Sequence, residues 1–83
     1  MTNFDEVRTI VGNSLQLGNR IQTMTRETHL LGSLPELDSM AVVNLIAALE
    51  EHFGFVVDDD EISAEVFSTL GSLEDFVTQK LSS

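Results

Sequence analysis

An aspartate and a serine, Asp38 and Ser39, directly precede the strongest helical pattern in the chain. Aspartate is a preferred N-cap residue, so the Asp38 side chain is expected to accept a hydrogen bond from the first helical turn. Ser39 then lies in that turn, where unpaired backbone N–H groups and the positive end of the helix dipole favour an anionic substituent. A phosphate ester on the Ser39 hydroxyl would be stabilised there, although the same pair can also serve for capping alone.

The helix predicted to position this serine runs from Leu37 to Phe53 and is followed by Gly54, a residue type that commonly ends a helix. Apolar residues recur in it at steps of three and four, which predicts one face toward a core: Val42, Leu45, Ile46, Leu49 and Phe53. The remaining positions are predicted to lie away from that core: Ala41, Asn44, Ala47, Ala48, Glu50 and Glu51.

Two further long helices are predicted, one near each end of the chain. The first begins with Asn3 as its N-cap, ends near Leu17 and Gly18, and has an apolar face made of Phe4, Val7, Ile10, Val11 and Leu15. The last begins at Leu70 or Ser72 and runs to Leu81, and its N-cap is either Thr69 or Ser72. Its apolar face comprises Leu73, Phe76, Val77 and Leu81.

The segments between these helices are predicted to contain one short helix. Residues 62–67 form it, capped by Asp59 or Asp60, and its apolar residues Ile62, Val66 and Phe67 turn inward. Residues 55–57 are expected to be extended without pairing as a strand. Residues 20–36 have no sustained period and form a long connection, which four leucines can anchor: Leu30, Leu31, Leu34 and Leu37.

Two other kinds of site fit this sequence less well than a modified serine. A Ser-His-Asp hydrolase would need His52, but thirteen residues of helix place it roughly 20 Å from Ser39 along the axis. His29 stays open by spacing, although no Gly-x-Ser-x-Gly sequence surrounds Ser39. The acidic run at residues 58–61 does not match a calcium loop, because Ser63 and Thr69 occupy the positions that need Gly and Glu. We therefore predict no metal site.

Composition indicates a single domain over residues 1–83, with 42% apolar residues, no cysteine and a formal net charge of −10. This charge disfavours nucleic acid and anionic membranes and favours partners with basic surfaces. No apolar run reaches the length of a membrane span, and the N-terminal sequence is unlike a secretory signal. We expect a cytoplasmic monomer that does not insert into membranes.

The combination of Asp38, Ser39 and Met40, an apolar helix ending in Ala-Leu-Glu-Glu-His-Phe-Gly, an acidic loop and a C-terminal amphipathic helix resembles the acyl carrier protein family. The resemblance covers roughly Leu30 to Leu81. It implies an all-α fold, a small helical bundle of three main helices plus one short helix. It also implies that a phosphopantetheinyl transferase attaches 4′-phosphopantetheine from coenzyme A to Ser39, and that the protein is a carrier and no enzyme.

The resemblance further implies a surface read by acyl-loading and acyl-accepting enzymes, made of Met40, Val43, Ala47, Glu50 and Glu51. General fatty-acid carriers typically have acidic residues where this chain has Ala41 and Asn44, which suggests a specialised partner. A second resemblance is to stand-alone carriers that are linked to exosortase and exopolysaccharide genes. The resemblance therefore leaves the pathway open among fatty-acid, polyketide and specialised exopolysaccharide-linked synthesis. The alternatives are an aminoacyl or peptidyl carrier, which often has Gly-Gly before Asp-Ser, and an unmodified acidic helical interaction module.

Overall fold

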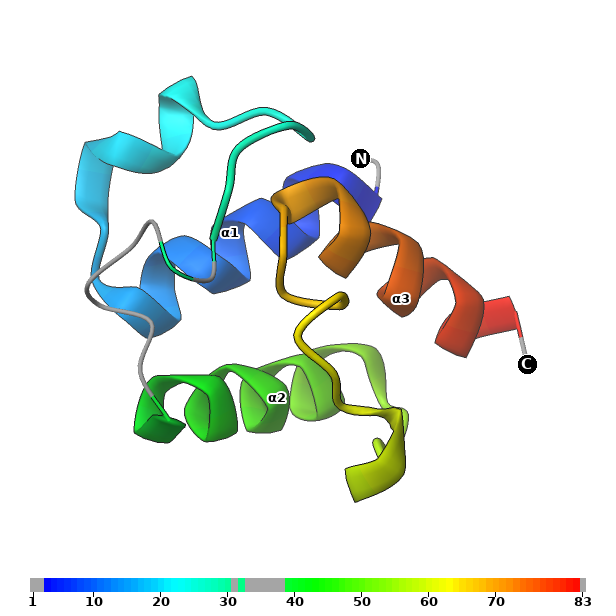
Figure 1. The fold of residues 1–83 in the computed structure, drawn as a ribbon. Coiled ribbons are helices and arrows are strands. Elements are labelled where there is room, and N and C mark those ends of the chain that lie inside the picture. The colour runs from blue at the N-terminus through cyan, green and yellow to red at the C-terminus, as the bar shows by residue number, and fades with distance from the viewer. Residues whose placement is uncertain (1–2, 31, 33–38, 83) are drawn as a thin grey trace.

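Three α-helices carry the fold in the computed structural model, which describes residues 3–30, 32 and 39–82 (Figure 1). They are α1 (Asn3–Leu15), α2 (Ser39–Phe53) and α3 (Leu70–Ser82), and two 3-10 helices lie between them, η1 (Gly18–Thr23) and η2 (Asp59–Glu61). The described residues form no strand, and their one isolated bridge joins His29 to Thr69. The predicted all-α fold class is confirmed.

The core lies where α1 packs against both α2 and α3 (Figure 1). Each helix contributes residues from its predicted apolar face, and the connection between α1 and α2 adds Leu17, Met24 and Leu30. The most deeply buried side chains are Val7, Val11, Leu30, Leu45, Leu49, Leu70, Leu73 and Val77. None of the described helices is long and apolar enough to cross a membrane.

The buried arc of α2 is wider than the sequence pattern indicates. Leu45 and Leu49 are fully buried, as predicted. Ala41 and Ala48, however, also pack against the core, although both were expected to face away from it. Phe53 is only partly buried because it lies in the last turn of the helix, where its ring stacks on Phe55 at a centroid distance of 5.9 Å. Ala41 and Ala48 are seven residues apart and lie on one flank of the leucine face, where their small side chains let a neighbouring segment approach.

Both ends of α1 differ slightly from the prediction. Asn3 is the first helical residue and not the cap before it, and its side-chain amide donates a hydrogen bond to Thr78 Oγ1 on α3 (3.1 Å). At the other end the helix stops at Leu15, two residues early, because Gln16 adopts a left-handed φ of 56°. The Leu17 amide then donates to the Gly12 carbonyl (2.9 Å), the hydrogen bond of a Schellman motif.

The described part of the connection after α1 contains a 3-10 helix that its sequence does not predict. It opens with η1, and Met24 and Leu30 are buried in the core, as anticipated for Leu30. The other predicted anchors, Leu31, Leu34 and Leu37, lie outside the described residues. Gly12 permits the close approach of η1, since a Cβ there would overlap the Ile21 side chain.

The start of α3 is capped by the connection as well as by its own residues. Thr69 is the N-cap: its hydroxyl accepts from the Ser72 amide and the Ser72 hydroxyl accepts from the Thr69 amide, both at 3.0 Å. The amides of Leu70 and Gly71 donate to the backbone carbonyls of Thr28 and Arg26, each at 2.9 Å. These four bonds satisfy first-turn donors that a helix cannot satisfy internally.

We expect Gly71→Ala to destabilise the protein. A Cβ at Gly71 would lie 2.8 Å from the Arg26 carbonyl oxygen, which cannot retreat without breaking its hydrogen bond to the Gly71 amide. Overpacking of this kind costs about 1 to 3 kcal/mol, which exceeds the gain of up to about 1 kcal/mol from alanine's helix propensity. Thermal unfolding followed by circular dichroism should show a lower Tm, and a raised Tm would contradict this packing.

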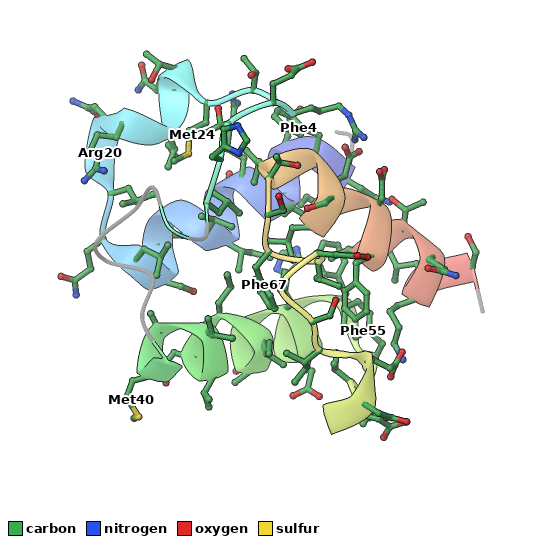
Figure 2. All side chains as sticks on the ribbon, viewed as in Figure 1. Phe4, Arg20, Met24, Met40, Phe55 and Phe67 are labelled. Atoms are coloured by element: carbon green, nitrogen blue, oxygen red, sulfur yellow. The ribbon has the colours of Figure 1, made fainter. Side chains whose placement is uncertain are left out.

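The short helix predicted at residues 62–67 does not form in the structure. One 3-10 turn forms earlier, at Asp59–Glu61, and residues 64–67 adopt hydrogen-bonded turns without becoming a helix. The Ser68 carbonyl instead accepts from the Leu30 amide (2.9 Å), so the chain must turn there to meet the connection. Phe67 is buried between the helices as predicted, whereas Ile62 is exposed (Figure 2).

Candidate functional site

Helix α2 begins at Ser39, so the structure places this residue in the first helical turn, as the sequence predicts. The first amides of a helix have no acceptor within the helix and remain available to an anion. Asp38 and the Ser39 side chain lie outside the described part of the structure, so the capping role of Asp38 stays a prediction. The backbone position of Ser39 fits a phosphate ester.

The side chains that follow Ser39 on the outer face of α2 are open to solvent. Met40 is 69% exposed and Val43 is 61% exposed, and Met40 extends away from the body of the protein (Figure 2). Asn44 and Ala47 are exposed as well. The described face of α2 that follows Ser39 is therefore open and mostly apolar.

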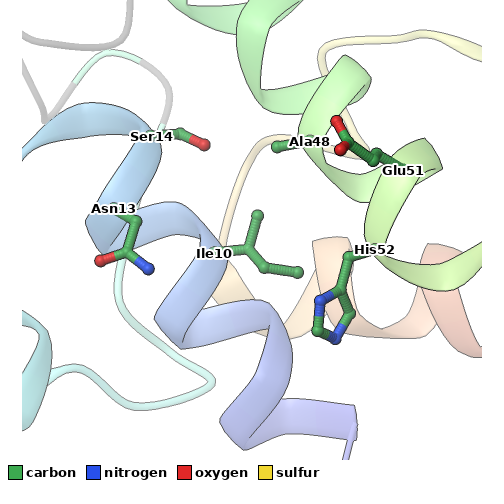
Figure 3. A pocket seen from close by; sticks show the side chains of 6 residues that line it. All are labelled: Ile10, Asn13, Ser14, Ala48, Glu51 and His52. Atoms are coloured by element: carbon green, nitrogen blue, oxygen red, sulfur yellow. The ribbon is translucent and has the colours of Figure 1, made fainter.

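The two glutamates of the predicted partner surface have different surroundings. Glu50 is half-buried, and its Oε2 accepts a hydrogen bond from the Val57 amide at 2.8 Å. Glu51 is exposed and lies on the other flank of α2, in a groove against α1 (Figure 3). Adjacent helical positions point about 100° apart, but only the tertiary structure shows that Glu50 accepts from a backbone amide and that Glu51 does not.

Two open grooves run along α2, one on each flank. The first, of about 240 Å³, lies between α2 and the segment that follows it, and is lined by Val43, Ile46, Ala47, Glu50, Val57 and Ile62. The second, of about 510 Å³, lies between α2 and α1 and is lined by Ile10, Asn13, Ser14, Ala48, Glu51 and His52 (Figure 3). The first groove is the more apolar of the two, because five of its six lining residues are apolar, against two of six in the second.

The two histidines contact different parts of the fold. His52 lies in the last turn of α2, at the opposite end from Ser39, and its Nε2 is 3.6 Å from Glu6 Oε1. His29 pairs with Thr69 at the start of α3. Each histidine therefore lies at a contact between two elements, and His52 is distant from Ser39, as its spacing along the helix predicts.

The acidic run at residues 58–61 is tied to α3 by an ion pair and is braced internally by a hydrogen bond to a backbone amide. Glu61 accepts a hydrogen bond from the Asp58 amide (2.9 Å) and from Lys80 Nζ on α3 (2.9 and 3.0 Å). These contacts, the Asp58 amide first and Lys80 second, hold the pKa of the Glu61 carboxyl below its ordinary value. Across the described residues, no three carboxylates, histidines or cysteines are grouped so as to bind a metal ion.

The lowered pKa of Glu61 predicts a pH-dependent contribution from Lys80. A carboxyl whose pKa is lowered by folding stabilises the protein above its unfolded value, about 4.3, and this stabilisation is lost as the pH falls through the folded value. Lys80→Met keeps the aliphatic stem and removes the ion pair. We expect its deficit in free energy of unfolding to shrink as urea denaturation is repeated from about pH 6 down to about pH 3. Lys80→Arg is the control that keeps the charge, and a pH-independent deficit for Lys80→Met would refute the assignment.

Comparison with known proteins identifies the class of protein to which this site belongs. A family model described as a phosphopantetheine attachment site matches residues 5–77, a range that includes Ser39. An acyl carrier protein of Guillardia theta is 36% identical over 78 residues, which cover 94% of this chain and 90% of that protein. The solution NMR structure of a holo acyl carrier protein from Nitrosomonas europaea has 60% sequence identity and a TM-score of 0.92, with 100% of each chain covered.

The chain belongs to the acyl carrier protein family, as its sequence resemblance implies. Its prosthetic group is 4′-phosphopantetheine. The contacts that sequence reasoning missed are those of Glu50 with Val57 and of Glu61 with Lys80. No pattern signals the first, because it spans a helix end, and the second joins residues nineteen positions apart.

Proposed function

We propose that this protein carries acyl groups as thioesters on a 4′-phosphopantetheine arm attached to the Ser39 oxygen. The observation that supports this best is the position of Ser39 as the first residue of α2, inside the region that matches the family model. The prosthetic group supplies the thiol for the thioester, which the polypeptide itself lacks, since it contains no cysteine. The protein acts as a carrier and not as an enzyme.

The residues around Ser39 stabilise the attachment and leave it accessible. The first amides of α2 and its dipole favour the negative charge of the phosphodiester. Asp38 is proposed to order this helix start as its N-cap. Met40 and Val43, both exposed, leave the arm room to swing between partner enzymes.

The partners we propose are a phosphopantetheinyl transferase and the enzymes that load and accept acyl groups. A net charge of −10 favours enzymes with basic surfaces over nucleic acid or anionic membranes, and we propose a cytoplasmic monomer with one carrier domain. Met40, Val43, Ala47 and Glu51 form the proposed partner surface. Glu50, predicted from the sequence as a fifth member, supports this surface through the hydrogen bond that its carboxylate accepts from the Val57 amide.

The exposed part of that surface suits a partner from a specialised lipid or exopolysaccharide-linked pathway better than a general fatty-acid enzyme. Of the two positions where general carriers have acids, Asn44 is exposed and Ala41 packs against the core. A carboxylate at residue 41 would therefore lose hydration against the core and destabilise the fold. Asn44→Glu is the substitution expected to improve docking to a general fatty-acid enzyme with a basic surface.

The proposal is tested by incubating the protein with coenzyme A, Mg²⁺ and a promiscuous phosphopantetheinyl transferase. Intact mass should rise by one phosphopantetheine, and a thiol assay should change from zero to one per chain, because the polypeptide has no cysteine. Supplying acyl-coenzyme A instead should yield the acylated protein and no free thiol. An unchanged mass would favour an unmodified interaction module and overturn the proposal.

A further inference from the structure

Glu50 anchors the chain where it leaves α2. Its backbone carbonyl accepts a hydrogen bond from the Gly54 amide (2.8 Å), and its side chain accepts one from the Val57 amide (2.8 Å). Between these two bonds, Gly54 adopts a left-handed φ of 79° and the rings of Phe53 and Phe55 stack in parallel. One residue therefore holds both ends of the turn that follows α2.

This anchoring sets the shape of the first groove. Val57 and Ile62 form its wall opposite Val43, Ile46 and Ala47 on α2. At the Val57 end the wall is joined to α2 by the Glu50 carboxylate, and at the Glu61 end to α3 by Lys80. The Val57 amide donates to the Glu50 side chain at 2.8 Å, within the normal range of a hydrogen bond, so this contact fixes the Val57 end of the wall.

The neighbouring Glu51 makes no comparable contact. It is exposed, and its carboxylate has neither a hydrogen-bond nor an ion-pair partner anywhere in residues 3–30, 32 and 39–82. It lines the groove between α1 and α2, whose α1 side carries the uncharged polar side chains of Asn13 and Ser14 (Figure 3). A basic side chain of a partner can therefore reach it without displacing an internal contact.

We propose that the two adjacent glutamates have separate functions. Glu50 is a positioning residue that fixes the wall of the first groove through the Val57 amide, and it acts as a hydrogen-bond acceptor more than as a charge. Glu51 is the charge at this end of α2 that meets a basic side chain of a partner enzyme. The second half of this assignment rests on the carrier function proposed above.

The two roles respond differently to the same substitutions. Glutamine keeps a side-chain oxygen that accepts a hydrogen bond but carries no charge, whereas alanine removes both. A positioning role is therefore rescued by Glu50→Gln and lost in Glu50→Ala. A charge that steers association is lost in Glu51→Gln and in Glu51→Ala alike. Glu51 is the matched control, because it is the same residue type in the next position of the same helix.

The positioning role is tested on the free protein by hydrogen exchange of individual amides, measured by NMR. We expect the Val57 amide to exchange about tenfold faster or more in Glu50→Ala, and within about threefold of wild type in Glu50→Gln and both Glu51 variants. The amide of Leu73, in the core helix α3, reports global stability and should change much less than that of Val57. Unchanged Val57 exchange in Glu50→Ala would overturn the positioning role.

The charge role is tested by the association rate with the transferase at about 50 and about 200 mM salt. Glu51→Gln should slow association severalfold at low salt and flatten its salt dependence, while Glu50→Gln stays near wild type. Equal slowing by both variants, or none by Glu51→Gln, would overturn the separation. Failure of the carrier function would be recognised separately, because the wild-type protein would then gain no phosphopantetheine. The exchange experiment on the Val57 amide would still test the role of Glu50.

Discussion

Ser39→Ala is expected to abolish attachment of 4′-phosphopantetheine completely. Attachment forms a phosphodiester between the arm and a side-chain hydroxyl, and alanine has no oxygen to form it. Ser39 is the serine that begins α2, where the helix amides and dipole favour the phosphate. After incubation with coenzyme A and transferase, intact mass should stay at the apo value for this variant and rise for wild type.

A second serine serves as the matched control for this experiment. Ser63 is exposed in the segment between η2 and α3, and Ser63→Ala should be loaded like wild type. Circular dichroism should show that the Ser39 variant keeps its helices. The loss of phosphopantetheine attachment could then not be attributed to unfolding. A mass gain on the Ser39 variant would move the attachment site to another residue and remove Ser39 from the proposed function.

Leu45→Ala should have the largest effect on stability among single substitutions in α2. Leu45 is fully buried at 0% exposure, in the part of the core where α2 meets α1. Truncating a buried leucine to alanine costs about 2 to 5 kcal/mol, because the cavity it leaves is only partly refilled. A domain of this size has few kcal/mol of net stability, so we expect urea unfolding at much lower concentration or an unfolded protein at 37 °C.

Val43→Ala is the control on the same helix. Val43 is 61% exposed, only two residues from Leu45, so its truncation removes little buried surface and should change the free energy of unfolding by no more than about 0.5 kcal/mol. Similar losses for the two variants would mean that α2 is rotated about its axis relative to the structure described here. The comparison therefore tests the orientation of the helix that carries Ser39.

Much of the fold follows from local patterns in the sequence. The spacing of Leu45 and Leu49 predicts the buried face of α2 because the helical period alone places them on one side. Thr69 and Ser72 predict the start of α3, since their hydroxyls can cap only nearby amides. Ser39 is predictable in the same way, from its position beside a residue that favours helix starts and within a motif shared with a known family.

Other features could not be predicted, because they depend on segments distant in the chain. Arg26 pairs with Glu74 and Asp75 of α3, which raises the pKa of its guanidinium, chiefly through the hydrogen bond to Asp75. These partners are nearly fifty residues apart in the chain, so no local sequence pattern predicts that they are in contact. The predicted helix at residues 62–67 failed for a related reason, since the bond between Leu30 and the Ser68 carbonyl requires a turn there.

The amino-acid sequence by itself determined three amphipathic helices, their buried leucines and valines, the strong negative charge and the serine at the start of α2, because each follows from helical periodicity, capping or composition. Tertiary structure alone decided what the two flanks of α2 contact. Periodicity places Glu50 and Glu51 at fixed angles around the helix axis, but it does not say which segment packs against each angle. The turn after α2 brings the Val57 amide to Glu50, while α1 leaves Glu51 open to solvent, and so two identical neighbours acquire different roles.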